Sequence, residues 1–210
     1  MKPMSRSLAH KLHEFTNLQA LLDCALAHCL DLCGTELGNI QLIDWNRGYL
    51  EIKSQHGFRD EFLTFFTRVT AKEGSACARA LRTLDPVVIE DVMVDNDFAP
   101  YRSIAYRSGF RAVQSTPVVS SSGATLGILS THFATPRRPD EKTMDALKGV
   151  ARLIADSIIF HRARGHSTSK EAILFRSRQT IEESYRAMQR ADQALMRPRQ
   201  FARSWDRRSE

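Results

Sequence analysis

The chain has 210 residues, of which 42% are hydrophobic and 26% charged, a composition typical of one soluble globular domain with extensions. No apolar run approaches the roughly 18–20 residues that a membrane-spanning helix needs, and the N-terminus lacks the apolar core of a secretory signal. Residues 1–160 hold 18 basic and 18 acidic residues, so the net charge of +6 arises from residues 161–210, with 12 and 6. We therefore expect no membrane partner and no basic nucleic-acid-binding face on the domain itself.

The first predicted element is a helix over residues 17–33, where apolar side chains recur at helical spacing. Thr16 or Asn17 can cap it, and Gly34 ends it. Three of the four cysteines fall within this helix, which makes a poor disulfide framework and indicates reduced thiols in a cytoplasmic protein. No set of three or four side chains has metal-ligand spacing, so we expect no metal site. The cysteines are Cys24, Cys29, Cys33 and Cys77.

Short strand and helix signals follow as far as residue 108. Two alternating segments separated by a turn predict a hairpin, and Ser75 is placed to cap a short helix. In order, the predicted elements are a strand over 39–44, a turn over 45–48, a strand over 49–55, a helix over 60–69, a helix over 75–81, a strand over 86–92 and a polar helix or loop over 95–108.

Two apolar runs, residues 112–119 and 125–133, are separated by a Ser/Gly cluster and predict a central hairpin. Both runs are too apolar to have a solvent-exposed face, so we expect both faces of the sheet to be covered by other parts of the protein. Pro117 cannot donate a ladder hydrogen bond, which places it near an edge or at a bulge. Gly127 indicates the close approach of another backbone or of a packed helix.

A long helix is predicted from about residue 138 to residue 163, and the order of elements indicates an α+β sandwich. Residues 171–195 are again helical, with Leu174, Ile181, Met188 and Leu195 recurring every seven residues. These four residues form a narrow apolar stripe, which we call the seam. It predicts either a homodimer through the helices or a helix folded back on the domain. The Arg-rich residues 197–210 are expected to be disordered.

Several strings in this order resemble the GAF family of small-ligand sensory domains, in particular those of bacterial sensor histidine kinases. The resemblance covers about residues 18–163 and is carried by ELGNIQLID, EGSACARAL, PVVIEDV, GFRAVQSTPVVSSSGATLGILSTHF and PRRP. It implies a central antiparallel sheet with the terminal helices on one face and short helices and loops over a pocket on the other. The implied domains are an extension over 1–15, the sensory domain over 16–164, a helical extension over 165–196 and a tail over 197–210.

The chain departs from parts of the wider GAF pattern. No kinase ATP-binding pattern and no phospho-acceptor histidine box is present, so a related kinase would be represented by its sensory part only. The segment where bilin-binding relatives carry a cysteine is Pro100–Ser103, without one. The pattern of the cyclic-nucleotide GAF domains is also not evident. The sequence therefore leaves the cofactor unknown.

By the resemblance and by strand periodicity, several side chains are expected to line the pocket. His132 would bond a ligand or, alternatively, a neighbouring carbonyl in a core, and Ser115 would share its face or be a surface or bulge hydroxyl. The aromatic residues before the hairpin suit either a small-molecule site or ordinary packing of a lid. Cys77 would be a thiol with a lowered pKa or a small buried hydrophobe. The candidate ligand-binding residues are Cys77, Phe98, Tyr101, Tyr106, Ser115, Ser130 and His132.

No catalytic constellation emerges, and we expect a non-enzymatic module of signal transduction, such as a two-component system. It would bind a small molecule or a partner protein and signal to a downstream protein through its terminal helices. The alternatives are an adaptor that binds nucleic acid or another anionic partner through the basic tail, and a thiol-dependent reductase that uses Cys77.

Overall fold

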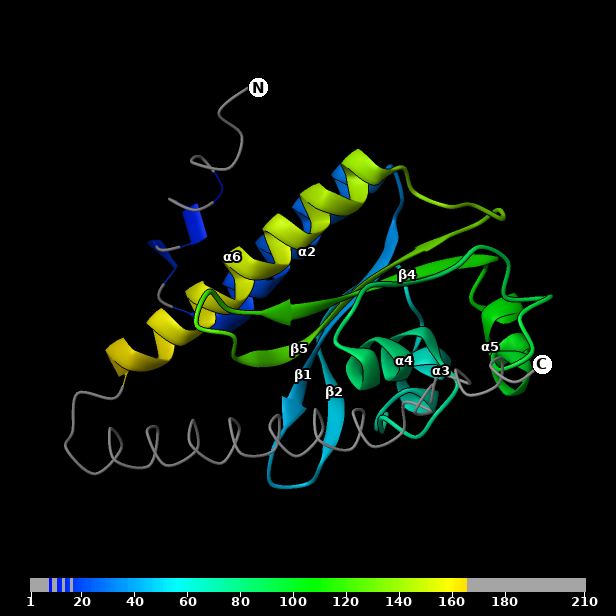
Figure 1. Ribbon diagram of the computed structural model, residues 1–210, viewed down its shortest axis with the longest axis horizontal. Coiled ribbons are helices and arrows are strands. Elements are labelled where there is room, and N and C mark those ends of the chain that lie inside the picture. The colour runs from blue at the N-terminus through cyan, green and yellow to red at the C-terminus, as the bar shows by residue number, and fades with distance from the viewer. Residues whose placement is uncertain (1–7, 9–10, 13, 16, 166–210) are drawn as a thin grey trace, which may run out of the picture. The chain divides into compact units, whose positions relative to one another are not determined.

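The computed structural model describes residues 8, 11–12, 14–15 and 17–165 (Figure 1). The predictions for the seam over 171–195 and for the Arg-rich tail lie outside the described residues. Within them, no helix is long and apolar enough to cross a lipid bilayer.

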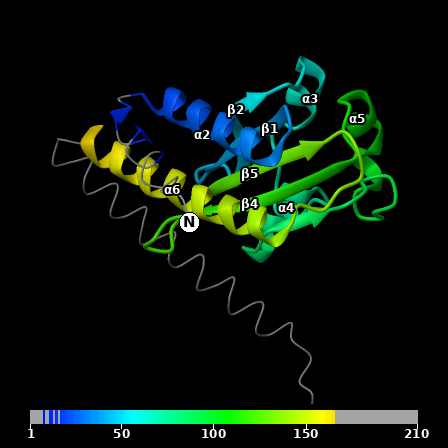
Figure 2. The ribbon, with the colours of Figure 1, turned by 90° about the horizontal axis from the view of Figure 1, so that it is seen from above.

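The described residues form a five-stranded antiparallel sheet in the order β2-β1-β5-β4-β3, with helices on both faces (Figures 1 and 2). This confirms the α+β sandwich and its central hairpin. The elements are α2 (Leu18–Cys33), β1 (Leu37–Asp44), β2 (Tyr49–His56), α3 (Asp60–Phe65), α4 (Ala76–Thr83), β3 (Val87–Ile89), η1 (Ala99–Tyr101), α5 (Arg102–Arg107), β4 (Ala112–Val119), β5 (Thr125–Phe133) and α6 (Glu141–Gly165).

Helices α2 and α6 lie side by side on one face of the sheet (Figure 2). The Asn17 side chain caps α2 by accepting a hydrogen bond from the Gln19 amide, and Gly34 ends it in the left-handed conformation. The core of this layer joins leucines of α2 to Leu147, Ile154 and Ile158 of α6. Leu8 and Leu12 are buried in the same core.

The opposite face carries α3, α4 and the η1–α5 segment, which we call the roof (Figure 1). Helix α3 is shorter than predicted because the Thr67 hydroxyl donates to the carbonyls of Leu63 and Thr64 and closes the last turn. Strand β3 is also shorter, since the chain turns away at Glu90, whose carbonyl accepts from the Arg137 amide.

Two Arg–Asp pairs tie the loop between β3 and η1 to its surroundings. The Arg79 guanidinium of α4 donates to both carboxylate oxygens of Asp95, and that of Arg111 to both oxygens of Asp91. The hydrogen bonds from the arginines lower the pKa of both carboxyl groups. The loop is therefore attached to α4 and to the start of β4.

Strand β5 pairs with β1 on one side and with β4 on the other, and all nine of its residues are buried. Gly127 lies where β1 approaches most closely, because a Cβ atom there would meet the Gln41 carbonyl oxygen at 1.9 Å. This confirms the predicted backbone approach. Pro117 lies on β4 beyond the end of the β3 pairing, so its missing amide donor leaves no ladder bond unmade.

Replacing Gly127 with alanine should lower the free energy of unfolding by at least about 2 kcal/mol, because the methyl group has no space between two paired strands. Gly149→Ala in α6 is the matched control. Nothing lies within 4 Å of its added methyl group, and the helix should gain up to about 1 kcal/mol. Urea unfolding of both variants measures this, and equal midpoints would contradict the packing described for β1 and β5.

Candidate functional site

Polar side chains cross the roof-facing side of the sheet in a row over three strands. Asn39 on β1 lies opposite Ser130 on β5, and Ser130 lies opposite Ser115 on β4. The hydroxyls of Ser115 and Ser130 are 2.8 Å apart and hydrogen-bonded. Gln41 and His132 lie beside this row. We call these five residues the floor.

The floor lies beneath an apolar cover contributed by the roof. Phe62 and Phe66 come from α3 and the residue that follows it, and Phe98 precedes η1. Residues 75–77 contribute the start of α4. Floor and cover enclose a cavity of about 20 Å³, which is room for roughly one water molecule.

His132 is held in an aromatic cage at one end of the floor. Its ring makes edge contacts with Phe58, Phe62 and Phe110 at centroid distances of 4.9, 5.8 and 4.6 Å. Burial lowers the pKa of His132 to about 3, with a smaller opposing effect from a hydrogen bond to the Leu37 backbone. The imidazole is therefore neutral at physiological pH.

Three buried atoms of the floor have no hydrogen-bond partner among the described residues. They are Asn39 Oδ1, Gln41 Oε1 and His132 Nδ1, on side chains of residues that are 3%, 2% and 5% exposed. Buried polar groups are nearly always paired, and leaving one unpaired costs about 1–3 kcal/mol. Three unpaired polar atoms belong to residues that line one cavity, and this makes the cavity a candidate binding site.

A buried amide on the other face of the sheet shows the usual arrangement. Gln114 on β4 faces the helices, and its Nε2 donates to Thr131 Oγ1 at 3.2 Å. Its Oε1 accepts from Thr116 Oγ1 at 2.9 Å. The helix face of the sheet thus satisfies its buried amide, whereas the roof face leaves the amide oxygens of Asn39 and Gln41 unpaired.

The structure brings together most of the residues predicted for the pocket. Ser115, Ser130, His132, Cys77 and Phe98 line the cavity. Two of the predicted aromatic residues do not line it.

Tyr106 is 77% exposed, so its assignment as a pocket residue is wrong. It lies on the outer side of the short helix α5, whose buried side chains are those of Ile104 and Ala105. Tyr101 packs within the roof instead. Its ring lies 6.0 Å from that of Phe66, and its hydroxyl accepts from the Gly74 amide at 3.3 Å.

Cys77 lies at the cavity, but its thiol is not activated. Burial raises its pKa to about 11, with a smaller opposing effect from its contact with the Ser75 hydroxyl at 3.4 Å. The alternative of a thiol with a lowered pKa is therefore wrong, because desolvation outweighs the contribution of the start of α4. Burial also raises the pKa of Cys29 and Cys33, so these thiols are held protonated too.

Asn39, Gln41, Phe62 and Phe66 also line the cavity and were not predicted as pocket residues. The signal for the first two was their period-two spacing on β1, which puts them on the face of the sheet opposite Ile40 and Leu42. Once the roof face is known to be covered, such polar positions become pocket candidates.

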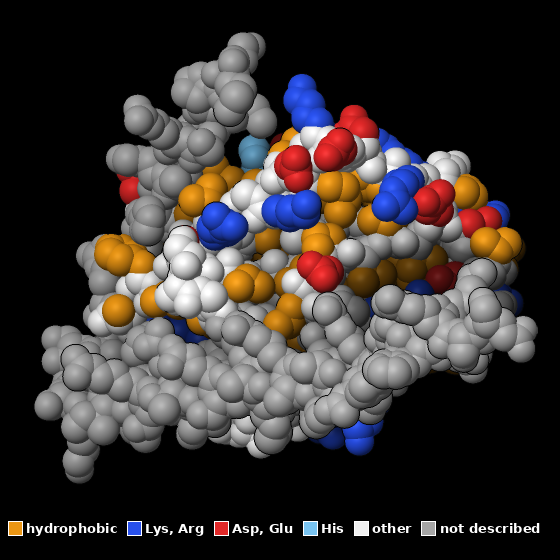
Figure 3. Space-filling model, viewed as in Figure 1, with side chains coloured by type: hydrophobic (Ala, Val, Ile, Leu, Met, Phe, Trp, Pro, Cys, Tyr) orange, Lys and Arg blue, Asp and Glu red, His pale blue; other side chains and the backbone are white. Residues whose placement is uncertain are grey.

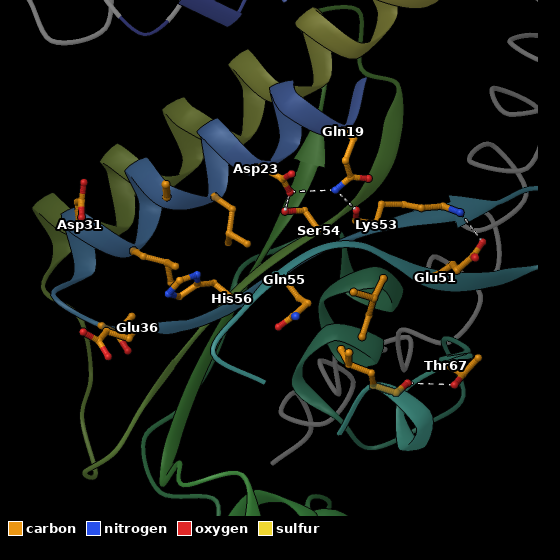
Figure 4. Close-up of a pocket in the computed structure, with 16 residues that line it drawn as sticks. Gln19, Asp23, Asp31, Glu36, Glu51, Lys53, Ser54, Gln55, His56 and Thr67 are labelled. Atoms are coloured by element: carbon orange, nitrogen blue, oxygen red, sulfur yellow. Dashed lines mark hydrogen bonds and ion pairs between the residues drawn. The ribbon is translucent and has the colours of Figure 1, made fainter. Parts of the chain in front are cut away.

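A second and larger hollow of about 810 Å³ opens between α2, β2 and α3 (Figure 4). Several of its polar side chains have partners within the protein. Asp23 Oδ1 accepts from Gln19 and from Ser54, and Lys53 pairs with Glu51 at 2.7 Å. This groove is open to water and leaves no buried polar atom unpaired among its described residues, so the smaller enclosed cavity is the better candidate site.

The face of the molecule that Figure 3 shows has no patch of one charge among its described residues. On the face in Figure 3, Lys and Arg side chains are interspersed with Asp and Glu rather than gathered in a patch of one sign. Among the described residues, no group of three or more potential ligands could hold a metal ion.

The sequence profile of the GAF domain matches residues 16–158. The chain belongs to the GAF domain family. GAF domains are typically small-molecule sensing modules of signalling proteins, and the enclosed cavity lies between the sheet and the roof of this GAF domain. A search of curated proteins found no match.

Solved structures share this GAF fold at low sequence identity. The GAF domain of an Acinetobacter phosphoenolpyruvate-protein phosphotransferase has a TM-score of 0.63 at 16% identity, over 79% of this chain and 99% of its own. A domain of a two-component sensor histidine kinase protein from Sinorhizobium meliloti gives 0.57 at 16%, over 70% and 94%. Free methionine-R-sulfoxide reductase from Neisseria meningitidis, solved with its substrate, gives 0.64 at 20%, over 76% and 89%. The fold thus also occurs in an enzyme.

The buried neutral His132 should make stability depend on pH. In the folded protein its pKa of about 3 lies below the ordinary value of 6.5. The contribution of the neutral ring to the free energy of unfolding is therefore fully present above pH 6.5 and is lost as the pH falls toward 3. Between pH 6 and 4.5 the free energy of unfolding should fall by up to about 1.4 kcal/mol per pH unit. The carboxyl pKa values of Asp91 and Asp95 are lowered from 3.8, so these groups change the stability mainly below pH 3.8, outside this window.

Urea titrations at several pH values measure the slope. His132→Phe should abolish this component, since phenylalanine fits an aromatic cage and does not titrate. His56→Gln, at an exposed position, should retain it. An equal slope in wild type and His132→Phe would show that His132 is not buried in its neutral form.

Proposed function

We propose that this GAF domain is a non-enzymatic sensory module that binds a small molecule between the floor and the roof and signals through α2 and α6. The observation that carries the proposal is the set of three unpaired buried polar atoms around one enclosed cavity. A protein gains no stability from such atoms, and a ligand that presents donors would pair them.

Binding requires the cover to move, because a cavity of about 20 Å³ holds little more than a water molecule. The part best suited to move is α3, a six-residue helix that supplies Phe62 and precedes Phe66. Its Glu61 pairs with Arg107 of α5 in an exposed ion pair at 2.7 Å, and such pairs contribute little to stability. A ligand would favour the conformation in which α3 has shifted outward, by its greater affinity for that conformation.

The floor is connected directly to α2. The carbonyl of His132 accepts a hydrogen bond from the Thr35 hydroxyl, just after α2, and Thr131 Oγ1 lies 3.7 Å from Cys33 Sγ at its last turn. On β1, a Cβ atom added at Gly38 would meet Leu30 at 2.8 Å, so the helix packs on the strand backbone. A change at His132 would therefore reach the end of α2 through bonded and packed neighbours.

The raised pKa values of three thiols support a binding module over a reductase. Cys77 is held as a neutral thiol, and burial raises the pKa of Cys29 and Cys33 as well. The thiolate is the nucleophilic form of cysteine, so these environments oppose thiol chemistry. The homodimer and the downstream partner remain predictions, since the seam proposed for them lies beyond residue 165.

Native mass spectrometry of the full chain purified from its own cells tests the proposal. We expect a bound small molecule on wild type and its loss from Ser130→Leu, which fills the centre of the floor. Thr64→Leu, at an exposed position of α3, is the control and should keep the ligand. A ligand retained by Ser130→Leu, or a wild-type protein that binds nothing from a cell extract, would contradict the proposal.

A further inference from the structure

The residues that line the enclosed cavity share a property that restricts the ligand: none of them carries a charge at neutral pH. The polar members are amides, hydroxyls, a thiol and an imidazole, and the remainder are apolar. The two titratable members are neutral, because burial lowers the pKa of His132 to about 3 and raises that of Cys77 to about 11. No lining side chain could pair with the charge of an ionised ligand.

An ionised ligand in this cavity would lose its hydration without gaining an opposite charge. Burying an unpaired ion costs far more than burying a neutral polar group that is hydrogen-bonded. The ion pair of Arg79 in α4 with Asp95 is not part of the lining, and its two charges already pair with each other. Ammonium ions are disfavoured on this ground, and a carboxylate or phosphate would gain only the partial positive charge at the start of α4.

The unpaired atoms add a second restriction, because the two amide oxygens among them can only accept hydrogen bonds. Asn39 Oδ1 and Gln41 Oε1 are amide oxygens and accept hydrogen bonds, and His132 Nδ1 accepts one when the neutral imidazole carries its proton on Nε2. The Ser115 and Ser130 hydroxyls bond to each other, which uses one of their two O–H donors and leaves the other donor available to a ligand. A ligand that satisfies this floor must present N–H or O–H groups.

The cover adds a third restriction through its aromatic rings. Phe62, Phe66 and Phe98 face the floor across the cavity. Aromatic side chains pack well against flat rings by offset stacking or edge contacts. A flat apolar body with a polar edge would contact the rings of the cover and the acceptors of the floor together.

We infer that the ligand is an uncharged, flat molecule with a primary amide or similar N–H-donating edge, which Asn39, Gln41 and His132 recognise. This inference rests on the proposed function and names the class of molecule that the site selects. It also separates this domain from an enzyme of free methionine sulfoxide, because the ammonium and carboxylate of a free amino acid would find no charged partner in this lining.

Three isosteric probes separate charge from hydrogen bonding: benzamide, benzoate and benzamidine. Benzamide is neutral and donates, benzoate is an anion without donors, and benzamidine is a cation that donates. Titration of the full chain, followed by backbone amide NMR, should give shifts in β1 and β5 with benzamide. The two charged probes should bind at least about tenfold more weakly, which corresponds to the loss of one good interaction.

A matched pair of variants tests the amides themselves. Gln41→Leu removes an amide with an unpaired oxygen and should raise Tm by about 2 °C or more, because it relieves an unsatisfied buried group. Gln114→Leu removes the amide on the helix face that is hydrogen-bonded through both its nitrogen and its oxygen, and should lower Tm. Gln41→Leu should also weaken benzamide binding about tenfold or more, whereas a folded Gln114→Leu should bind it as wild type does.

The outcomes separate this inference from the proposed function. Equal binding of benzoate or benzamidine at β1 and β5 would overturn the inference and leave a ligand-binding cavity in place. No shifts with any probe, together with a loss of stability in Gln41→Leu like that of Gln114→Leu, would mean that buried water satisfies the floor. That result would overturn both. Selective benzamide binding with a stabilised Gln41→Leu would support both.

Discussion

The rest of the structure depends on strand β5 being buried on both faces while it is hydrogen-bonded on both edges. Alternation along the strand then divides its side chains between two cores. Leu129, Thr131 and Phe133 face the helices, and Ile128, Ser130 and His132 face the roof. A residue of β5 that faces the cavity is therefore a direct neighbour of one that faces the helices, and this places the cavity close to α2.

The two faces treat their polar groups differently. On the helix face, Gln114, Thr116 and Thr131 form a chain of hydrogen bonds that satisfies the buried amide. On the roof face, the amide oxygens of Asn39 and Gln41 are unpaired. At about 1–3 kcal/mol for each unpaired group, the floor gives up more stability than the rest of the described structure, where Thr125 Oγ1 at the start of β5 is the one other unpaired buried side-chain atom. Such a local loss is typical of a site whose partner is not part of the chain.

Most of the fold could be predicted because its determinants are local. The capping asparagine at Asn17, the left-handed Gly34 and the Ser/Gly turn between β4 and β5 each act within a few residues. Gly127 was informative for a different reason, since a glycine inside an apolar strand has few explanations other than close approach. The ends of α3 and β3 could not be predicted, because they are set by Thr67 and by a contact from the distant Arg137.

The site was predicted only in part, because the sequence does not show which faces of its elements the roof covers. Asn39 and Gln41 alternate with apolar residues on β1, a pattern typical of a strand with one face in water. Only the roof, which is built from segments far along the chain, turns that face into a buried one. The prediction for Tyr106 was wrong in the opposite direction. This aromatic residue was expected to be covered, but it lies on the outer side of a short helix and is 77% exposed.

The most direct test is a crystal structure of the protein as isolated from its own cells, at a resolution that shows ligands in the cavity. The account predicts density for an uncharged group between the floor and a displaced Phe62, with donors on Asn39 Oδ1 and Gln41 Oε1. Both amide oxygens bonded to protein groups alone, beneath an unmoved cover, would contradict it.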